Sequence, residues 1–436
     1  MLAEFNKKEA FKFIIKESHS VPLPDTIPRD LDVPLSSKKI ITVFGPRRCG
    51  KSFYFYTLIK KLIGRNISED RILYVNFEDD RILPLSVKDL NSLIEAYFEL
   101  YPDNKNRGVF FFFDEIQNIN NWELFVRRIY DKENVKIFLT GSSSKLLSKE
   151  ISTHLRGRAL SFRLNTLNFK EFIRFKGENL EKNFEYSNQR FKIKKFLEEY
   201  LEWGGFPEIA LEPDVQLKKK ILSEYFHSLI YKDLSERFSL KNTQFLKEFL
   251  KYLFTNVSSL FSVNAYYKNV KQNISISRQT ISEYLNFIQE TEYFSFLPIF
   301  SYSLKVQTAN PKKIICIDTG LRNNISFRLS KDEGKLAENL VGMLLDKKNS
   351  GEKDTFYWQE KKEVDFVVKE KGKLTALNIC FGQQIRENEI FSLLEFCQRF
   401  KKIKELVIVT KDLEKEEKEI RFIPLWKWLL SYTSSG

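Results

Sequence analysis

Residues 39–52 read KIITVFGPRRCGKS, an apolar run that leads directly into a loop bracketed by two glycines. The octapeptide from Gly45 to Ser52 matches the pattern G-x-x-x-x-G-K-S, and a helix-forming stretch follows it. In such a strand, loop and helix, successive backbone N–H groups turn inward on phosphate oxygens, and the helix N-terminus adds its positive dipole. A glycine-rich turn that binds nothing is the alternative, and the complete pattern argues against it. The sequence therefore predicts a nucleotide-phosphate site.

Roles within this loop follow from the chemistry of its side chains. Lys51 is expected to reach the β- and γ-phosphate oxygens of ATP, and the hydroxyl of Ser52 is expected to ligate Mg²⁺. The residues predicted to contact the nucleotide are Gly45, Pro46, Arg47, Arg48, Cys49, Gly50, Lys51, Ser52 and Phe53.

The acidic residues that this site needs come later in the chain. Val109 to Phe113 is an unbroken apolar run, typical of a parallel strand buried on both faces, and Asp114 and Glu115 follow it directly. Ligands of α/β sheets bind at the carboxyl ends of the strands. We expect Asp114 to lie on the Mg²⁺ side and Glu115 to be the catalytic base that polarises the attacking water. Acids that merely cap a strand are common, but the phosphate loop upstream favours the catalytic interpretation.

Hydroxyl and guanidinium groups extend the predicted site. Ser142 lies in a hydroxyl cluster after the fourth predicted strand, where it could sense the γ-phosphate or cap the next helix. Arg156 and Arg158 precede the fifth predicted strand, and either could stabilise transition-state charge in the site of a neighbouring subunit. Surface salt bridges are the competing interpretation for both arginines.

Length, charge and composition narrow the class of protein. A chain of 436 residues is expected to form two or three domains. Its net charge of +13 favours a polyanionic partner such as nucleic acid, with a lysine-rich solvated surface as the alternative. No apolar run approaches the length of a membrane span and the N-terminus lacks a signal-peptide profile, so we expect a cytoplasmic protein with no membrane partner. Four scattered cysteines and three histidines indicate neither a disulfide framework nor a zinc site.

Four strings carry a family resemblance. GPRRCGKS, FFFFDEIQNINNWELFVRRIYD, FLTGSSSKLLSKEISTHLRGRALSF and LEWGGFPE together resemble the archaeal-type P-loop ATPases, near the AAA and STAND groups, over nearly the whole chain. The resemblance implies that Lys51, Ser52, Asp114 and Glu115 serve ATP and Mg²⁺, and that a C-terminal domain of unknown function follows. The segment from Gly204 to Pro207 resembles the G-x-P motif of STAND ATPases. Taken without the family, it is a turn between two helices.

A winged helix is predicted after a helical segment at 215–260. A short helix at 263–272 and a turn precede an amphipathic helix, and runs at 294–302 and 313–317 are the expected wing strands. The second helix begins with hydrogen-bonding residues at the position where recognition helices contact a DNA groove. These expected DNA-contacting residues are Ser277, Arg278, Gln279 and Thr280. Many winged helices contact proteins instead, and that alternative stays open.

The C-terminal segment resembles a restriction-endonuclease core whose site is damaged. A predicted helix carries Glu338, a strand start carries Asp365, and the next strand carries Asn378 and Cys380 where the pattern requires Glu and Lys. One metal carboxylate and the water-activating amine are therefore missing from the pattern. We expect no nuclease activity. The domain is expected either to retain a surface that recognises the shape of DNA or to have a purely structural role.

The fold class and the domain boundaries follow from the order of predicted elements. Apolar runs alternate with helical stretches from 39 to 164, which predicts an α/β parallel sheet of the P-loop NTPase type, then the helical and winged-helix segment, then an α/β restriction-endonuclease-like domain. The predicted domains are a helical lead-in and linker (1–37), a P-loop ATPase core (38–170), a helical connector (171–260), a winged helix (261–325) and a degenerate nuclease-like domain (326–436).

Together these features predict a Mg²⁺-dependent ATPase that forms homo-oligomers and couples ATP binding and hydrolysis to DNA binding or remodelling. Two alternatives stay open. A STAND-type switch in defence or signalling would use ATP binding to gate assembly. A protein-remodelling ATPase would bind a protein partner through its C-terminal domain.

Overall fold

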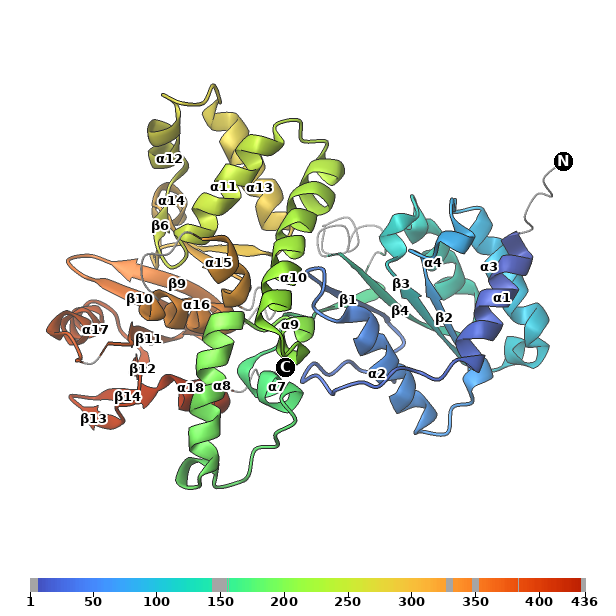
Figure 1. Ribbon diagram of the computed structural model, residues 1–436, viewed down its shortest axis with the longest axis horizontal. Helices are drawn as coiled ribbons and strands as arrows, with labels where there is room; N and C mark the ends of the chain where they lie inside the picture. The colour runs from blue at the N-terminus through green and yellow to red at the C-terminus, as the bar shows by residue number, and fades with distance from the viewer. Residues whose placement is uncertain are drawn as a thin grey trace. The chain divides into compact units, whose positions relative to one another are not determined.

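The computed structural model describes residues 7–142, 155, 157–326, 332–346, 353–382 and 384–432 (Figure 1). The chain divides into two compact units, one spanning 1–165 and the other spanning 166–435, and each is described by itself. Among the described residues, no helix combines the length and the apolar character that a membrane crossing requires.

The first unit is built on a five-stranded parallel sheet with the strand order β2-β3-β4-β1-β5. Its strands are β1 (Ile40–Gly45), β2 (Ile72–Asn76), β3 (Val109–Asp114), β4 (Val135–Ser142) and β5 (Ala159–Arg163). Between and before them lie the helices α1 (Lys7–Ser20), α2 (Lys51–Ile63), α3 (Asp89–Leu100) and α4 (Trp122–Lys132). The predicted parallel α/β sheet is confirmed.

Strand β3 fixes the carboxyl edge of this sheet because both of its faces are buried. Phe111 and Phe113 pack in one hydrophobic cluster with residues of α1, α3 and α4, whereas Phe112 packs in another with residues of α2. The ring of Phe112 stacks on that of Phe138 in β4, with 4.5 Å between the ring centroids. Side chains that alternate between two packed layers hold the strand in register, so the residue at its end has a defined position.

The second unit begins with helices and a small antiparallel sheet. The helices are α7 (Phe169–Phe175), α8 (Gln189–Trp203), α9 (Pro207–Leu211), α10 (Val215–Ser228), a π-helical stretch (Leu229–Glu236) and α11 (Thr243–Thr255). There follow β6 (Leu260–Phe261), α12 (Val263–Val270), α13 (Arg278–Glu290), β7 (Phe294–Leu297), α14 (Leu304–Ala309), β8 (Lys312–Cys316) and α15 (Thr319–Ile325). The three strands pair antiparallel in the order β6-β8-β7.

A six-stranded mixed sheet completes the second unit, with the strand order β13-β14-β12-β11-β10-β9. Its elements are α16 (Glu333–Leu345), β9 (Lys353–Gln359), β10 (Glu363–Glu370), β11 (Lys373–Cys380), α17 (Glu387–Arg399), β12 (Ile403–Thr410), β13 (Lys415–Glu417), β14 (Ile420–Pro424) and α18 (Leu425–Ser431). β9, β10 and β11 form an antiparallel meander, and β12 then runs parallel to β11 after α17. In Figure 1 this sheet is drawn in orange and red.

Candidate functional site

The phosphate loop lies between the end of β1 and the start of α2. Gly50, the residue before α2, has a left-handed backbone with φ of 92°, which glycine adopts at low cost. A Cβ at Gly45 would lie 2.0 Å from the carbonyl oxygen of Leu164, so that position also requires glycine. The two glycines of the sequence pattern are therefore explained by backbone geometry and by close packing, respectively.

The side chain of Lys51 is buried at the centre of this loop. Its Nζ donates to the carbonyl oxygens of Gly45, at 3.3 Å, and Pro46, at 3.2 Å, and lies 3.6 Å from Oε1 of Glu115. Burial lowers the pKa of Lys51, but the attraction of Glu115 and Asp114 outweighs it, so the net shift is upward. The ammonium is therefore charged and held by weak, long contacts, which phosphate oxygens can replace.

Asp114 ends β3 as a fully buried carboxyl group with several donors around it. The hydroxyl of Tyr74 donates to Oδ2 at 2.9 Å, Thr140 donates to Oδ1, and Ser52 adds a further hydrogen bond. Burial raises the pKa of Asp114, and the hydrogen bonds from Ser52, Thr140 and Tyr74 counteract this rise. The hydroxyl of Ser52 and the carboxylate of Asp114 are thus adjacent oxygen ligands, the donor set that suits Mg²⁺.

Glu115 has a left-handed backbone, with φ of 53°, and its Oε1 lies 3.6 Å from Nζ of Lys51 in the loop. Its N–H donates to Oγ1 of Thr140 at 3.0 Å, and its carboxylate faces Lys51 on one side and the amide of Gln117 on the other. Non-glycine residues in this backbone region are uncommon and are often found at functional sites. The structure therefore brings Lys51, Ser52, Asp114 and Glu115 together in one site, as expected from the sequence.

The other loop residues predicted to contact the nucleotide differ in their exposure, their partners and their backbone conformation. Arg47 Nη1 lies 3.8 Å from a carboxylate oxygen of Glu78, and the ring of Phe53 is half-exposed. Cys49 is buried, which raises the pKa of its thiol, and its carbonyl oxygen accepts a hydrogen bond of 2.8 Å from Arg29. Arg48 has a left-handed backbone with φ of 68°.

Two further residues at this site, Tyr74 and Gln117, are not among those predicted from the sequence. Tyr74 comes from β2 and Gln117 from the short turn Ile116–Asn118 that follows β3. Only the register of β2 against β3, which pairs Asn76 with Asp114, brings the Tyr74 hydroxyl to the carboxylate. Gln117 could have been suspected, because it follows the acidic pair directly along the chain.

Three other residues predicted for this site are Ser142, Arg156 and Arg158, of which the structure describes only the side chain of Arg158. Arg156 and the side chain of Ser142 lie outside the described residues. Arg158 forms an ion pair with Asp131, with 2.9 Å between Nε and Oδ1 and partial exposure of both side chains. Within one chain, Arg158 therefore forms a surface salt bridge, which was the alternative role predicted for it. Its role toward another subunit stays a prediction.

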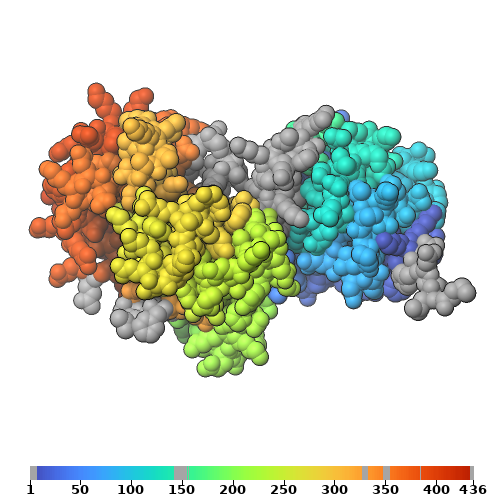
Figure 2. Space-filling view, turned by 90° about the horizontal axis from the view of Figure 1, so that it is seen from above, coloured from blue at the N-terminus to red at the C-terminus, as the bar shows by residue number. Residues whose placement is uncertain are grey.

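The four residues expected to contact DNA lie at the start of α13. Ser277 caps the helix, since its Oγ accepts from the N–H of Thr280 at 3.0 Å, and the two hydroxyl groups also bond to each other. Gln279 donates to Glu283 at 3.0 Å, and the guanidinium of Arg278 lies 5.0 Å from the ring centroid of Tyr267. In Figure 2 the yellow to gold part of the chain, which includes α12 and α13, lies on the visible face. Arg278 and Gln279 are exposed, whereas Ser277 and Thr280 are engaged in the cap.

The C-terminal acids form a polar cluster with a buried amine. Nζ of Lys313, from β8, lies 2.7 Å from Glu338, 2.7 Å from Glu363 and 3.4 Å from Asp365. The ligand oxygens of these three acids lie within 4.8 Å of one another, so their geometry could also hold a metal ion. The sequence pattern, in which Cys380 replaces the usual lysine, indicated that no amine is present. That expectation is wrong, because the amine comes from a distant strand.

Asn378 and Cys380 do not take the places of the missing pair. Asn378 is buried, where its Oδ1 accepts from the N–H of Asp365 at 3.0 Å and its Nδ2 donates to Ser392 at 2.8 Å. Cys380 is buried and its thiol contacts the carbonyl oxygen of Gln384 at 3.4 Å. Both side chains therefore support the backbone around the cluster.

The Gly-Gly-Phe-Pro segment packs against the start of α15. A Cβ at Gly204 would lie 2.2 Å from Oδ1 of Asp318, and one at Gly320 would lie 1.9 Å from the carbonyl oxygen of Trp203. The N–H of Gly205 donates to Oδ2 of Asp318 at 2.7 Å. Within the second unit, these glycines permit the close contact between α8 and α15.

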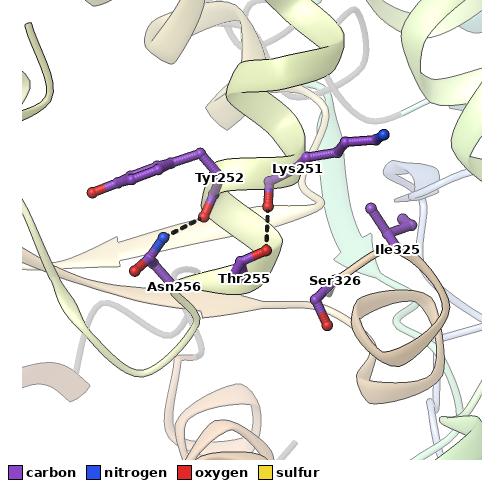
Figure 3. Close-up of a pocket in the computed structure, with 6 residues that line it drawn as sticks. All are labelled: Lys251, Tyr252, Thr255, Asn256, Ile325 and Ser326. Carbon is purple, nitrogen blue, oxygen red and sulfur yellow. Dashed lines mark hydrogen bonds between the residues drawn. The ribbon is translucent and has the colours of Figure 1, made fainter. Parts of the chain in front are cut away.

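A pocket of about 500 Å³ lies at the carboxyl end of α11 (Figure 3). Its polar groups serve the helix itself, since Thr255 donates to the carbonyl oxygen of Lys251 and Asn256 to that of Tyr252, each at 2.8 Å. Figure 3 shows these bonds along the helix rather than across the pocket. The pocket offers no convergent chemistry comparable with the phosphate loop.

Comparison with protein families identifies three consecutive regions. A model described as an AAA domain matches residues 37–173, a domain of unknown function (DUF8612) matches 194–333, and another (DUF4143) matches 333–428. The AAA match covers the phosphate loop and both acids, which confirms the predicted P-loop nucleotide-binding domain.

Several proteins are similar to this chain. The uncharacterized protein MJ1544 of Methanocaldococcus jannaschii is 34% identical, with 98% of this chain and 96% of that protein covered. An uncharacterized protein of Haemophilus influenzae is 28% identical, with 90% and 94% covered. Among solved structures, the Walker-type ATPase PABY2304 of Pyrococcus abyssi has a TM-score of 0.42 at 15% identity, covering 74% of this chain and 95% of that one. The Aeropyrum pernix ORC1 protein in complex with DNA has a TM-score of 0.31 at 10% identity, with 78% and 93% covered.

Proposed function

Because the chain belongs to the same family as the Methanocaldococcus jannaschii protein MJ1544 and carries an AAA domain, we propose that it is a Mg²⁺-dependent ATPase. One observation carries the proposal: Lys51, Ser52, Asp114 and Glu115 converge at the carboxyl edge of one parallel sheet. The residues fit the cofactor, since the loop holds a buried, charged ammonium and the adjacent hydroxyl and carboxylate oxygens match the preference of Mg²⁺.

The residues of the site have separate roles in binding and in chemistry. The loop N–H groups and Lys51 would bind the terminal phosphates. Ser52 and Asp114 would hold a Mg²⁺ ion, which when bound would offset the charge of the phosphates. Glu115 accepts a proton from the attacking water, and the hydroxyl groups of Tyr74 and Thr140 fix the orientation of Asp114. The half-exposed ring of Phe53 is available to the nucleotide beside the loop.

Two substitutions test this function and separate binding from chemistry. Lys51→Ala should lower both ATP affinity and turnover, by about 100-fold or more in turnover, because it removes the ammonium at the terminal phosphates. Glu115→Gln should retain bound ATP unhydrolysed and lower turnover by about 10² to 10⁴, because only the base is lost. Steady-state turnover and retention of radiolabelled ATP after gel filtration measure the two effects.

Lys61→Ala is the matched control, since Lys61 lies on the same helix and its side chain is exposed beside Asp32. Its turnover should equal that of the parent. Parent-like turnover in Lys51→Ala would overturn the proposed function, and rapid hydrolysis by Glu115→Gln would assign the base to another residue.

DNA binding by α12 and α13 is a second candidate function, favoured by the order α11-β6-α12-α13-β7-β8 and the antiparallel β6-β8-β7 sheet. This order is that of a winged helix, and three exposed cations, Lys268, Lys271 and Arg278, lie on α12, after it and at the start of α13. The segment between β7 and β8, where a wing would lie, is engaged with β9. The N–H of Phe300 donates to the carbonyl oxygen of Tyr357, and the N–H of Tyr357 donates to that of Pro298. We therefore assign any DNA contact to the two helices.

A salt titration tests DNA binding. The logarithm of the affinity should fall steeply with the logarithm of salt concentration, and Arg278→Ala should reduce that slope by about one, because one phosphate contact is lost. Lys369→Ala, on an exposed position of β10, should leave the slope unchanged. A flat salt dependence would favour a protein partner or a STAND-type switch over DNA.

The C-terminal domain has the element order of a restriction-endonuclease-like core, α16-β9-β10-β11-α17-β12. We propose that it does not cut DNA, because β11 carries Asn378 and Cys380 where the pattern requires Glu and Lys. Lys313 reaches the acids from β8 instead, outside the pattern, and is held there by ion pairs. Incubation of the pure protein with duplex and single-stranded DNA and Mn²⁺ should yield no products. Cleavage that Asp365→Ala abolishes would refute this proposal.

A further inference from the structure

Gln117 is a buried amide directly beside the candidate base. It lies in the turn Ile116–Asn118 that follows β3, and only 7% of its surface is exposed. Its Nε2 donates a hydrogen bond to Oε2 of Glu115, while its own Oε1 is buried and has no hydrogen-bond partner among the described residues.

The unpaired oxygen shows that packing alone does not account for this amide. A buried acceptor without a partner is destabilising, because it has lost its hydrogen bonds to water. An apolar side chain of similar size would fill the same space without that penalty. What an apolar side chain cannot supply is the hydrogen bond to Glu115.

Among the described residues, Lys51 and Gln117 contact the Glu115 carboxylate. Lys51 lies 3.6 Å from Oε1, and Gln117 donates to Oε2. Phosphate oxygens compete for Lys51 when nucleotide is bound, so its hold on Oε1 weakens at the stage when the base must act. The turn that carries Gln117 continues directly from the buried strand β3, so the position of its amide beside Glu115 is set by the strand and not by the phosphate loop.

We infer that Gln117 is a positioning residue that holds Glu115 in place through Oε2 and leaves Oε1 for the attacking water. This inference rests on the proposed ATPase function. Removal of the amide should let the carboxylate rotate away from the water without affecting the phosphate loop. A displacement of this kind lowers the rate of the chemical step and leaves nucleotide affinity unchanged.

Gln117→Met tests the inference in turnover, because methionine has a similar length and no N–H donor. The kcat should fall by about 10- to 100-fold, while the KM and the affinity for a fluorescent ATP analogue stay at parent values. Asn118→Ala is the matched control, since Asn118 is exposed in the same turn and should retain parent kinetics. If Gln117→Met does not fold, Gln117→Asn provides the same measurement, because its shorter side chain draws the donor back from Glu115.

A second measurement uses the protein without nucleotide. The urea midpoint is determined for the parent, Gln117→Met, Glu115→Ala and the double variant, so that the contact is isolated by a double-mutant cycle. The shift caused by Gln117→Met should differ between the parent and the Glu115→Ala background, because the partner is absent in the latter. Equal shifts in both backgrounds would overturn the inference, as would a parent-like kcat in Gln117→Met.

The outcomes distinguish failure of the proposed ATPase function from failure of the role of Gln117. A folded parent without ATP turnover would overturn the proposed function, and the role of Gln117 in hydrolysis would fall with it. Turnover in the parent together with unchanged kinetics in Gln117→Met would overturn the role of Gln117 alone.

Discussion

Asp318 is a fully buried carboxyl group that ties two segments of the second unit together. It accepts hydrogen bonds from the N–H of Gly205 at 2.7 Å and from that of Leu321 at 2.8 Å. Burial raises the pKa of Asp318 to about 7, although these backbone donors counteract the rise. Its ordinary value is 3.8, so the native protein binds this proton more tightly than the unfolded chain does.

The sign of the resulting pH dependence follows from linkage. The contribution of Asp318 to stability is fully present below its unfolded pKa of 3.8, and it is lost as the pH rises through its native pKa of about 7. We expect the urea midpoint of the second unit to fall between pH 5 and pH 7 more steeply in the parent than in Asp318→Asn, which cannot titrate. Identical pH profiles of the two proteins would show that Asp318 is ionised throughout that range.

At the scale of secondary-structure elements, Lys313 connects β8 to the C-terminal sheet. Its ammonium pairs with Glu338 of α16 and with Glu363 and Asp365 of β10, and its side chain is 1% exposed. Burial lowers the pKa of Lys313, but the three carboxylates outweigh this and raise it. Breaking a buried ion pair by removing one partner leaves uncompensated charge, which is strongly destabilising.

Lys313→Met should therefore destabilise the second unit by about 3–5 kcal/mol, measured by urea unfolding. Lys312→Met is the matched control, because Lys312 precedes it on β8 and is only half-buried. Its unfolding free energy should change by less than about 0.5 kcal/mol, as is usual for surface substitutions. Equal stabilities of the two variants would mean that solvent screens the cluster despite its burial.

At the scale of the whole molecule, Arg156 and Arg158, which precede β5, are predicted to act between subunits. Arg158 pairs with Asp131 within one chain, and we predict that Arg156 or Arg158 offsets the charge that develops on the γ-phosphate in a neighbouring subunit. ATPase activity per subunit should then rise with protein concentration.

Mixing subunits tests the same prediction directly. Neither Arg158→Ala nor Lys51→Ala subunits should turn over ATP efficiently alone, whereas a mixture should regain activity because each supplies what the other lacks. The same applies to Arg156→Ala. Activity that is independent of concentration, with no gain on mixing, would leave both arginines with structural roles only.

The sequence alone determined the phosphate loop, the acids after β3 and the parallel sheet that joins them. These features are local, because a phosphate cradle is made by consecutive backbone groups and requires glycine at fixed spacing, and because a strand buried on both faces must be apolar throughout. The sequence was therefore sufficient to predict the roles of Lys51, Ser52, Asp114 and Glu115.

Only the tertiary structure decided which residues meet these groups from elsewhere in the chain. Tyr74 reaches Asp114 through strand register, and Lys313 reaches three acids although the local pattern around Cys380 indicated that no amine is present. Gly204 and Asp318 meet because two helices pack closely. Such contacts depend on register and packing between distant segments, for which a linear pattern of residue types holds no signal.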